Sequence, residues 1–350
     1  MALLESEGHA GIRRGSGLPV AGYDVVVLGE PMVERHRTMD GQQAAPDSVS
    51  GDAFNAACAA ALAGARVALL TVLGADPAGD LILAELVRRG VDASQVRRGG
   101  ERTGAYTVSP DAEGQPRFSY QRAGSAATTL SPAHLALWGP ILDDTPVLIT
   151  SGVTAAISPS AAELVVAAVT RVARAGGAPC YDVNYRPNLT DADSARGALR
   201  AVAADCRLVK LASPGDSSPL LGIVEATAVA TALAEFTRAA VAVTRGDAPL
   251  LLTDGGQTTE HPAVRMPTPV DSTGAGDILL GTLAARLALG ESLASAAPLA
   301  VVAAGLSTRH RGGAPRATLD EVRAALAGAP RTAGPSADAP RALEEQEARP

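Results

Sequence analysis

Aromatic side chains and lysine are the scarcest features of this 350-residue chain. Phenylalanine, tryptophan and tyrosine make up only 3% of the residues, so alanine, valine and leucine must fill any core. Lys210 is the only lysine, and arginine supplies the remaining positive charge within a net charge of −7. A general nucleic-acid binder would show a basic excess or a basic stripe, so we expect no nucleic-acid partner.

Cysteine is also scarce. The three cysteines, Cys58, Cys180 and Cys206, are widely spaced, form no CxxC pair and are odd in number. A disulfide framework or a cysteine-ligated zinc site would need paired or closely spaced cysteines. We therefore expect three reduced, mostly buried thiols in a reducing compartment, and hence a cytoplasmic protein.

Long apolar runs are missing as well. No run reaches the ~20 residues of a membrane span without glycine, proline or charge, so no membrane partner is expected. Glu5, Glu7 and His9 stand where a signal peptide needs an uninterrupted apolar core. Residues 1–20 and 331–350 are irregular in pattern and rich in small, proline or charged residues, which predicts disordered tails.

Between those tails, strand and helix patterns alternate, and 47% of the whole chain is apolar. A chain of this length can bury a core without disulfides or metals. The alternation predicts an α/β fold with a mostly parallel sheet covered by helices on both faces. The predicted strands are 23–30, 66–74, 146–152, 178–187, 206–213, 239–246 and 249–256, and the predicted helices are 52–65, 77–90, 158–177, the stretch after Asp277 and 291–308.

Two segments interrupt the alternation. Residues 101–122 have the pattern of a β-hairpin with proline and glycine in its connection, and residues 34–51 can supply another short extended pair. A small β-flap on an α/β body suggests a lid that covers a ligand. We therefore expect lid segments at about 32–50 and 101–123.

The stretch DSTGAGD, residues 271–277, combines two acids with a small-residue turn and precedes a predicted helix. A helix N-terminus attracts anions, and Gly274 and Gly276 let the backbone approach a phosphate closely. Asp277 would repel a resting anion there, but as a base it could accept a proton from an attacking hydroxyl. The layout suits phosphoryl transfer from a nucleotide to an alcohol. A simple helix cap by Thr273 or Asp277 is the alternative.

In its context this stretch resembles the second signature of the PfkB, or ribokinase-like, family of carbohydrate kinases. VVVLGEP (25–31), SGDAFNAACAAALAG (50–64) and LLTVLGADPAGDLILAELVRRGVD (69–92) are similar to other segments of that family. The resemblance runs from about residue 22 to about 325. It implies a kinase domain over residues 21–330 with a ribokinase-like three-layer α/β/α sandwich, a mostly parallel central sheet and a small β-lid.

Four further segments are similar to 2-keto-3-deoxygluconate kinases. They are SGVTAAISP (151–159), DVNYRPNL (182–189), FSYQRAGSAA (118–127) and RGGAP (311–315). In those enzymes a tyrosine and an arginine on the lid meet the substrate.

In this chain Tyr120 and Arg122 occupy those lid positions. Arg186, in the NYRP loop, matches the arginine of the corresponding loop in those enzymes. Two arginines suit a sugar acid, because a guanidinium pairs with a carboxylate through two parallel hydrogen bonds. The alternative to binding a sugar acid is that Arg122 and Arg186 lie on the surface or contact the nucleotide.

The resemblance implies a role for each matching position. Asp277 would be the general base, and Gly274, Ala275 and Gly276 would form the anion hole. Contacts to the sugar would come from Gly51, Asp52, Asn55, Tyr106, Tyr120, Arg122, Arg186 and Asp277. Contacts to the nucleotide would come from Asn184, Arg186, Ser213, Thr244, Arg245, Gly246, Gly274 and Gly276.

Ser213 and Asp216, in SPGD, resemble a variant of the family's NxxE motif, so Asp216 would hold Mg²⁺ through water. Other departures concern the sugar and adenosine contacts. Ser50 replaces a glycine, Pro249 follows a nucleotide loop that lacks its second glycine, and Gly313 stands where some relatives carry an acid. Thr244 also stands where the subgroup often has lysine. Asp277 and the anion hole are intact.

These observations predict an ATP- and Mg²⁺-dependent sugar kinase, with a monovalent cation such as K⁺ as a further cofactor. The expected acceptor is 2-keto-3-deoxygluconate. The alternatives are 5-dehydro-2-deoxygluconate, a neutral sugar such as fructose or ribose, and a catalytically silent family member that senses sugars. The expected partners are the sugar, ATP and a second copy of the chain, paired as a homodimer through the lid.

Overall fold

The computed structural model describes residues 22–328, apart from 114, 265, 267 and 268. The tails predicted at 1–20 and 331–350 lie outside the described residues. Within the described part of the chain, no helix combines the length and the apolar character that a bilayer span requires. The three cysteines are free and buried.

A nine-stranded sheet forms the middle layer, in the order β15-β14-β13-β12-β11-β10-β1-β4-β6. Neighbours from β6 to β13 run parallel, and β14 and β15 are added antiparallel at one edge. The central strands are apolar throughout because both of their faces are buried. The strands are β1 (Val25–Leu28), β4 (Val67–Leu70), β6 (Val91–Asp92), β10 (Val147–Ser151), β11 (Ala178–Asp182), β12 (Leu208–Ala212), β13 (Ala240–Arg245), β14 (Ala248–Asp254) and β15 (Gln257–His261).

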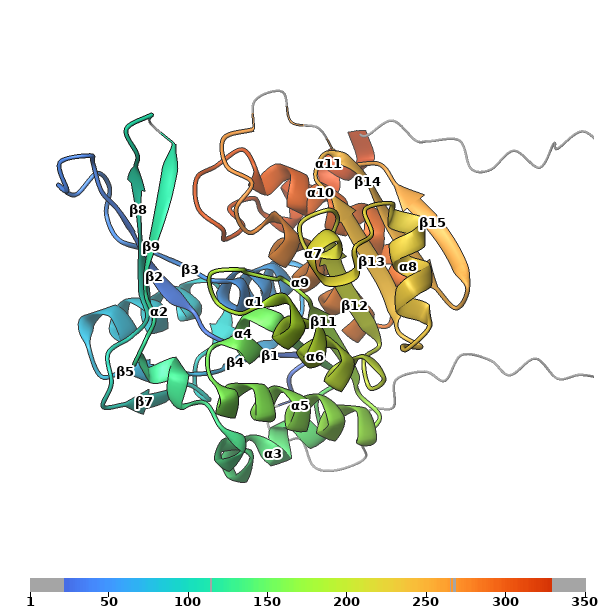
Figure 1. Cartoon of the computed structure of the whole chain (residues 1–350), viewed down its shortest axis with the longest axis horizontal. Coiled ribbons are helices and arrows are strands. Elements are labelled where there is room, and N and C mark those ends of the chain that lie inside the picture. The colour runs from blue at the N-terminus through green and yellow to red at the C-terminus, as the bar shows by residue number, and fades with distance from the viewer. Residues whose placement is uncertain (1–21, 114, 265, 267–268, 329–350) are drawn as a thin grey trace, which may run out of the picture.

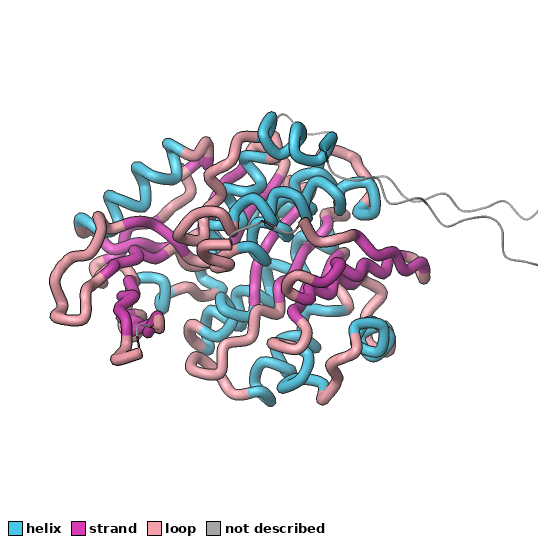
Figure 2. The backbone as a smooth tube through the Cα atoms, turned by 90° about the horizontal axis from the view of Figure 1, so that it is seen from above, coloured by secondary structure: helices cyan, strands magenta, loops and turns pink. Residues whose placement is uncertain are grey.

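Helices cover both faces of this sheet, and Figure 2 shows the strands running between them. Two separate hydrophobic clusters, one on each face, hold the layers together. One layer contains α1 (Asp52–Leu62), α2 (Pro77–Arg88), α9 (Ala275–Ala288) and α10 (Leu293–Ser307), with α11 (Leu319–Gly328) packed on α10. The other contains α3 (Leu135–Asp143), α4 (Gly152–Ala156), α5 (Pro159–Arg174), α6 (Ala192–Ala203), α7 (Ser217–Leu221) and α8 (Ala226–Ala234).

Small residues let α1 and α9 pack closely, which explains how a chain poor in aromatics fills its core. A methyl group on Gly281 of α9 would overlap the carbonyl oxygen of Ala56 and would lie 2.9 Å from the Cβ of Ala59. This contact matters for function because both helices begin at the same edge of the sheet.

A second sheet stands beside the central one, at the left of Figure 1. Its order is β3-β2-β8-β9. The hairpin predicted at 101–122 is confirmed as β8 and β9, paired antiparallel, and the extended pair predicted at 34–51 corresponds to β2 and β3. The strands are β2 (Met32–His36), β3 (Ser48–Ser50), β8 (Ala105–Pro110) and β9 (Pro116–Gln121).

Some elements differ from the prediction. The single strand predicted at 66–74 is wrong, because the chain leaves the central sheet at Thr71 and continues as β5 (Val72–Gly74), which pairs with β7 (Arg97–Gly99). The exposed strand β15 was missed since it has no apolar alternation. Helices α3, α6 and α8 were also missed. In α6, for example, the fully buried stripe is only Leu199, Val202 and Ala203.

Candidate active site

A cavity of about 710 Å³ opens between the second sheet and the carboxyl ends of the central strands. This edge of an open parallel sheet is where ligands usually bind. The cavity is lined by most of the residues predicted from the sequence: Gly51, Asp52, Asn55, Tyr106, Tyr120, Arg122, Asn184, Arg186, Asp216, Thr244, Gly274, Gly276 and Asp277.

A larger hollow of about 1020 Å³ lies between α3, α5 and α6. Its lining is mainly apolar, and none of the predicted site residues reaches it. The chemistry therefore points to the smaller cavity.

Asp277 lies in the first turn of α9, at the wall of this cavity. The side-chain amide of Asn55, on α1, donates a hydrogen bond of 2.9 Å to its Oδ2. Burial raises the pKa of Asp277 to about 6, with the nearby charge of Asp52 adding to the effect while Lys210 opposes it. A carboxyl group with such a pKa is ionised at neutral pH and basic enough to accept a proton.

In the turn before α9 the backbone packs closely against the backbone of Gly313. Gly274 has φ +77°, and a methyl group there would overlap the backbone of Gly313, so only glycine fits. Asp271 fixes the turn by accepting hydrogen bonds from the N–H groups of Thr273 and Gly312, at 2.9 and 3.0 Å. The N–H groups in the first turn of a helix have no acceptors within it. The N–H of Ala275 donates to the carbonyl of Ser272, before the helix, at 3.2 Å, so the start of α9 offers a site for an anion chiefly at Gly276.

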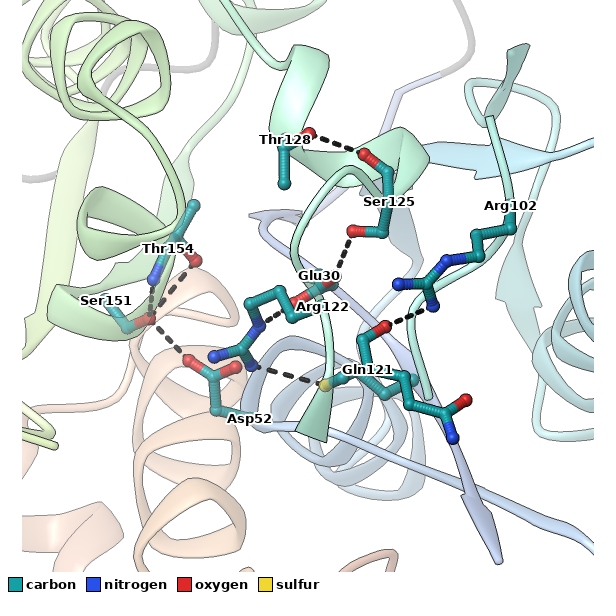
Figure 3. A network of polar contacts seen from close by, with 10 residues as sticks. Glu30, Asp52, Arg102, Gln121, Arg122, Ser125, Thr128, Ser151 and Thr154 are labelled. Atoms are coloured by element: carbon teal, nitrogen blue, oxygen red, sulfur yellow. Dashed lines mark hydrogen bonds and ion pairs between the residues drawn. The ribbon is translucent and has the colours of Figure 1, made fainter. Parts of the chain in front are cut away.

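The N-terminus of α1 faces the same cavity. Gly51 precedes it with φ +109°, a conformation that favours glycine. Asp52 accepts a hydrogen bond from the hydroxyl of Ser151, which also caps α4 by accepting one from the N–H of Thr154. The carboxylate of Asp52 is thereby held at the cavity wall (Figure 3).

Arg122 is paired within the protein. Its Nε donates to Oε2 of Glu30 at 2.5 Å, and Glu30 is only 1% exposed. The hydroxyl of Ser125 donates to the other oxygen of Glu30 at 3.1 Å. Figure 3 shows the guanidinium bound to Glu30 and to the sulfur of Met32. A substrate carboxylate would therefore bind an arginine whose position is already fixed by Glu30. The contact between Arg122 and a substrate stays a prediction.

Glu30 was missed from the sequence. Burial raises its pKa, and the charge of Arg122 opposes this. The only signal was its place directly after a buried strand, in VVVLGEP.

Aromatic side chains of the second sheet form the wall opposite α1. The ring of Tyr106 lies 5.6 Å from that of Tyr120 and 6.2 Å from that of Phe118. The hydroxyl of Tyr106 donates to buried Glu34 at 2.6 Å, while Tyr120 is 46% exposed. Tyr106 is therefore a fixed part of the wall, and the ring of Tyr120 is open to a ligand.

The other end of the cavity is formed by the loop after β11. Arg186 is exposed, its Nη1 donates to the carbonyl of Tyr185, and no described carboxylate pairs with it. Asp216 accepts hydrogen bonds from the N–H groups of Tyr185 and Ala212, at 2.9 and 2.7 Å. Asp216 thus fixes the loop that carries Asn184, a residue with φ +40°.

Four predicted residues do not line the cavity. The hydroxyl of Ser213 donates to the carbonyl of Val224 at 2.5 Å. The guanidinium of Arg245 bonds the carbonyl of Pro249 and pairs with Glu260, both at 2.7 Å. The others are Gly246, in a turn, and Ala275, the first residue of α9. Their contacts with a nucleotide or a phosphate stay predictions.

Sequence reasoning also missed an ion pair in the cavity wall. Lys210 and Asp182 are 4% and 2% exposed, and Lys210 Nζ lies 2.7 Å from Asp182 Oδ2. The available signal was a lone lysine in the middle of the apolar strand pattern CRLVKLAS. A charged side chain in a strand that is buried on both faces needs a residue of opposite charge beside it.

With this geometry in place, the comparisons with known proteins identify the class. Residues 23–318 match the pfkB family carbohydrate kinases. The chain therefore belongs to the PfkB family of sugar kinases, and its fold is the ribokinase-like three-layer α/β/α sandwich with a small second sheet.

Two curated proteins and one solved structure show which PfkB kinases this chain is similar to. The chain is 29% identical over 317 residues to 2-dehydro-3-deoxygalactonokinase of Haloferax volcanii, covering 87% of this chain and 97% of that one. It is 29% identical over 296 residues to 2-dehydro-3-deoxygluconokinase of Thermoproteus tenax, covering 82% and 89%. A candidate ribokinase II from E. coli, in complex with ATP and Mg²⁺, superimposes with a TM-score of 0.77 at 24% identity, covering 87% and 99%.

Proposed function

We propose that this kinase transfers the γ-phosphoryl group of ATP to a hydroxyl group of a 2-keto-3-deoxy sugar acid, with 2-keto-3-deoxygluconate as the first candidate. The observation that carries the proposal is Asp277, a carboxylate at the start of a helix, held by Asn55 in a cavity that also presents Arg122 and Arg186. The names of the two curated relatives support the substrate class. The galactonate epimer is the second candidate because one of those relatives is named for it.

The proposed chemistry follows from the positions of the side chains. Asp277 accepts the proton of the attacking hydroxyl, and the N–H of Gly276 holds the transferring phosphoryl group. The N–H of Ala275 joins it by exchanging its bond to the carbonyl of Ser272 for one to the phosphoryl group. Asp52 and Asn55 hold the sugar hydroxyls. Arg186, exposed and without a described carboxylate partner, lies between the sugar acid and the phosphates.

Mg²⁺ and ATP are proposed on the same basis. Among the described residues, no group of three or more histidine, cysteine or acidic side chains could hold a metal ion. That fits Mg²⁺, which is usually bound by one or two carboxylates together with substrate phosphates and water. Asp216, in the cavity wall, would hold it through water, and when bound it neutralises charge on the phosphates. A requirement for K⁺ stays a prediction.

The assembly and location are proposals too. Residues 117–121 of the edge strand β9 are all exposed, which supports a homodimer formed through the second sheet. We also propose that the lid segments at 32–50 and 101–123 close over the sugar within a kinase domain spanning residues 21–330. The three buried, unpaired cysteines support a cytoplasmic location.

The test is ADP release by the purified chain with ATP and Mg²⁺ on a panel of acceptors. The panel contains 2-keto-3-deoxygluconate, its galactonate epimer, 5-dehydro-2-deoxygluconate, fructose and ribose. We expect kcat/KM for one of the two 2-keto-3-deoxy acids to exceed that for fructose by at least about a hundredfold, since two charge-assisted contacts are at stake. Preference for a neutral sugar would reject the substrate class, and no turnover on any acceptor would favour a sensing role.

A further inference from the structure

The buried pair of Lys210 and Asp182 has no role in the chemistry described above. The two residues face each other in register, Lys210 on β12 and Asp182 at the end of β11. A buried ion pair is weak evidence for stability, because well-packed apolar residues of the same size often serve as well or better. Stability alone therefore does not explain why this pair is present, and we looked for a role in the chemistry of the site.

The ammonium group lies directly against the first turn of α9. A methyl group on Gly276 would lie 2.6 Å from Lys210 Nζ and 3.3 Å from its Cε. Any side chain at this place would force the ammonium to move from its position beside Asp182. Gly276 is thus needed for a second reason, in addition to the approach of a phosphate from the cavity side.

Asp182 lies near Asp277, which stands in the wall of the candidate active-site cavity. Both border a second, very small cavity of about 10 Å³ that Asp52 also lines, room for about one water molecule. The Oδ1 of Asp182 is buried and has no hydrogen-bond partner among the described residues. One oxygen of Asp182 therefore holds the lysine, and the other faces no protein donor.

The charges around Lys210 keep it protonated. Burial alone would lower the pKa of Lys210, but Asp182 on β11, Asp277 on α9 and Asp216 after β12 outweigh burial and raise it. Asp277 in turn faces Asp52 on α1, which favours its neutral form, and Lys210, Asn55 and Arg186, which favour its ionised form. Lys210 is therefore a positive charge beside Asp277, in the wall of the same cavity.

We infer that Lys210 is a positioning residue for phosphoryl transfer: held by Asp182, its ammonium places a fixed positive charge behind the first turn of α9. There it stabilises the ionised form of Asp277 and adds to the attraction of the helix start for the transferring phosphoryl group. Lys210 keeps its proton throughout, and the proton of the attacking hydroxyl goes to Asp277. This inference rests on the proposed function.

The first test compares pH profiles of kcat/KM in four variants. In Lys210→Met, the acid limb should move up by about one pH unit, as expected when an opposite charge a few ångström away is lost. Asp182→Asn should not move it up, because the ammonium remains. Lys210→Met/Asp182→Asn leaves no unpaired buried charge, so it should fold, and its acid limb should still move up. Lys210→Arg should restore part of the wild-type profile.

The control is the more exposed pair Arg207–Asp254, 2.8 Å apart, which joins the residue before β12 to the last residue of β14. Arg207→Met/Asp254→Asn should leave the acid limb in place. If the folded Lys210→Met/Asp182→Asn variant shows an unmoved acid limb, the inference is wrong. Asp277→Asn would be inactive in that case too, and the proposed function would stand.

The second test does not depend on turnover. Because Lys210 is the only lysine, ¹³C-lysine labelling gives a single side-chain Cε resonance. That resonance should shift as the pH passes about 6, where Asp277 titrates, and this step should disappear in Asp277→Asn. Burial also raises the pKa of Asp182, the direct partner of Lys210, to about 7, so the measurement is repeated in Asp182→Asn, which removes the step of Asp182 itself. A resonance of Asp182→Asn without a step near pH 6, or a step that persists in Asp182→Asn/Asp277→Asn, would overturn the inference even if no acceptor sugar were found.

Discussion

Removing the guanidinium of Arg122 should affect stability as well as the substrate. Arg122→Ala leaves Glu30, 1% exposed, as a buried carboxylate whose remaining described partner is the hydroxyl of Ser125. Breaking one side of a buried pair costs about 3–5 kcal/mol. Since the arginine side chain is 15% exposed, we expect about 3 kcal/mol. With an unfolding entropy of about 2.1 cal/mol/K per residue, this corresponds to roughly 4 °C in Tm for a chain of this length.

A second substitution separates the two effects. In Arg122→Met/Glu30→Gln both charges are gone, so most of the lost stability should return. The loss for a sugar acid should not return, because the charge-assisted pair is still missing, at about 1.5–3 kcal/mol. That corresponds to about ten- to hundredfold in kcat/KM. Turnover of fructose should recover with stability.

The assay combines thermal unfolding with kcat/KM on 2-keto-3-deoxygluconate and fructose, for the wild type, Arg122→Ala, Glu30→Gln and the double variant. A Tm for Arg122→Ala within about 1 °C of the wild type would refute the structural role of the pair. Equal losses on both substrates in the double variant would refute the contact with a carboxylate.

Four further predictions concern single groups. Asp277→Asn should lower kcat by about two to four orders of magnitude with little change in sugar affinity, and a residual rate above about a tenth would show that Asp277 is not the base. Wild-type kcat/KM should fall below about pH 6, since Asp277 must be ionised to act. Its raised pKa also means that the folded state holds this proton more tightly than the unfolded state, where the carboxyl titrates near ~3.9. This group should therefore reduce the free energy of unfolding as pH rises from about 4 to 6, and chemical denaturation of Asp277→Asn should lack that contribution. Burial raises the pKa of Cys58 and Cys180 to about 12, so Ellman's reagent should label the native protein much more slowly than the unfolded protein.

Much of the site could be predicted because its parts are local in sequence. DSTGAGD combines the turn, the glycines and Asp277 within seven residues, and the structure places it at the start of α9 in the cavity wall. The parallel sheet followed from the alternation of apolar strands with helices. The hairpin of β8 and β9 followed from its own turn residues.

The missed parts depend on residues far apart in the chain. Glu30 and Arg122 are 92 positions apart, and nothing in the neighbourhood of either residue indicates the other. Lys210 and Asp182 meet only because β11 and β12 are neighbours in the sheet. The division of residues 66–74 at Thr71 likewise depends on β7 being present to pair with β5. Such contacts are set by the tertiary structure.

The most direct test of the central claim is transfer of the labelled γ-phosphoryl group from ATP to 2-keto-3-deoxygluconate or its galactonate epimer, measured side by side with the wild type and Asp277→Asn. The wild type should form the phosphate ester of at least one sugar acid, and Asp277→Asn should form it at least about a hundredfold more slowly. Labelled fructose phosphate as the main product, or equal ester formation by both proteins, would contradict the claim.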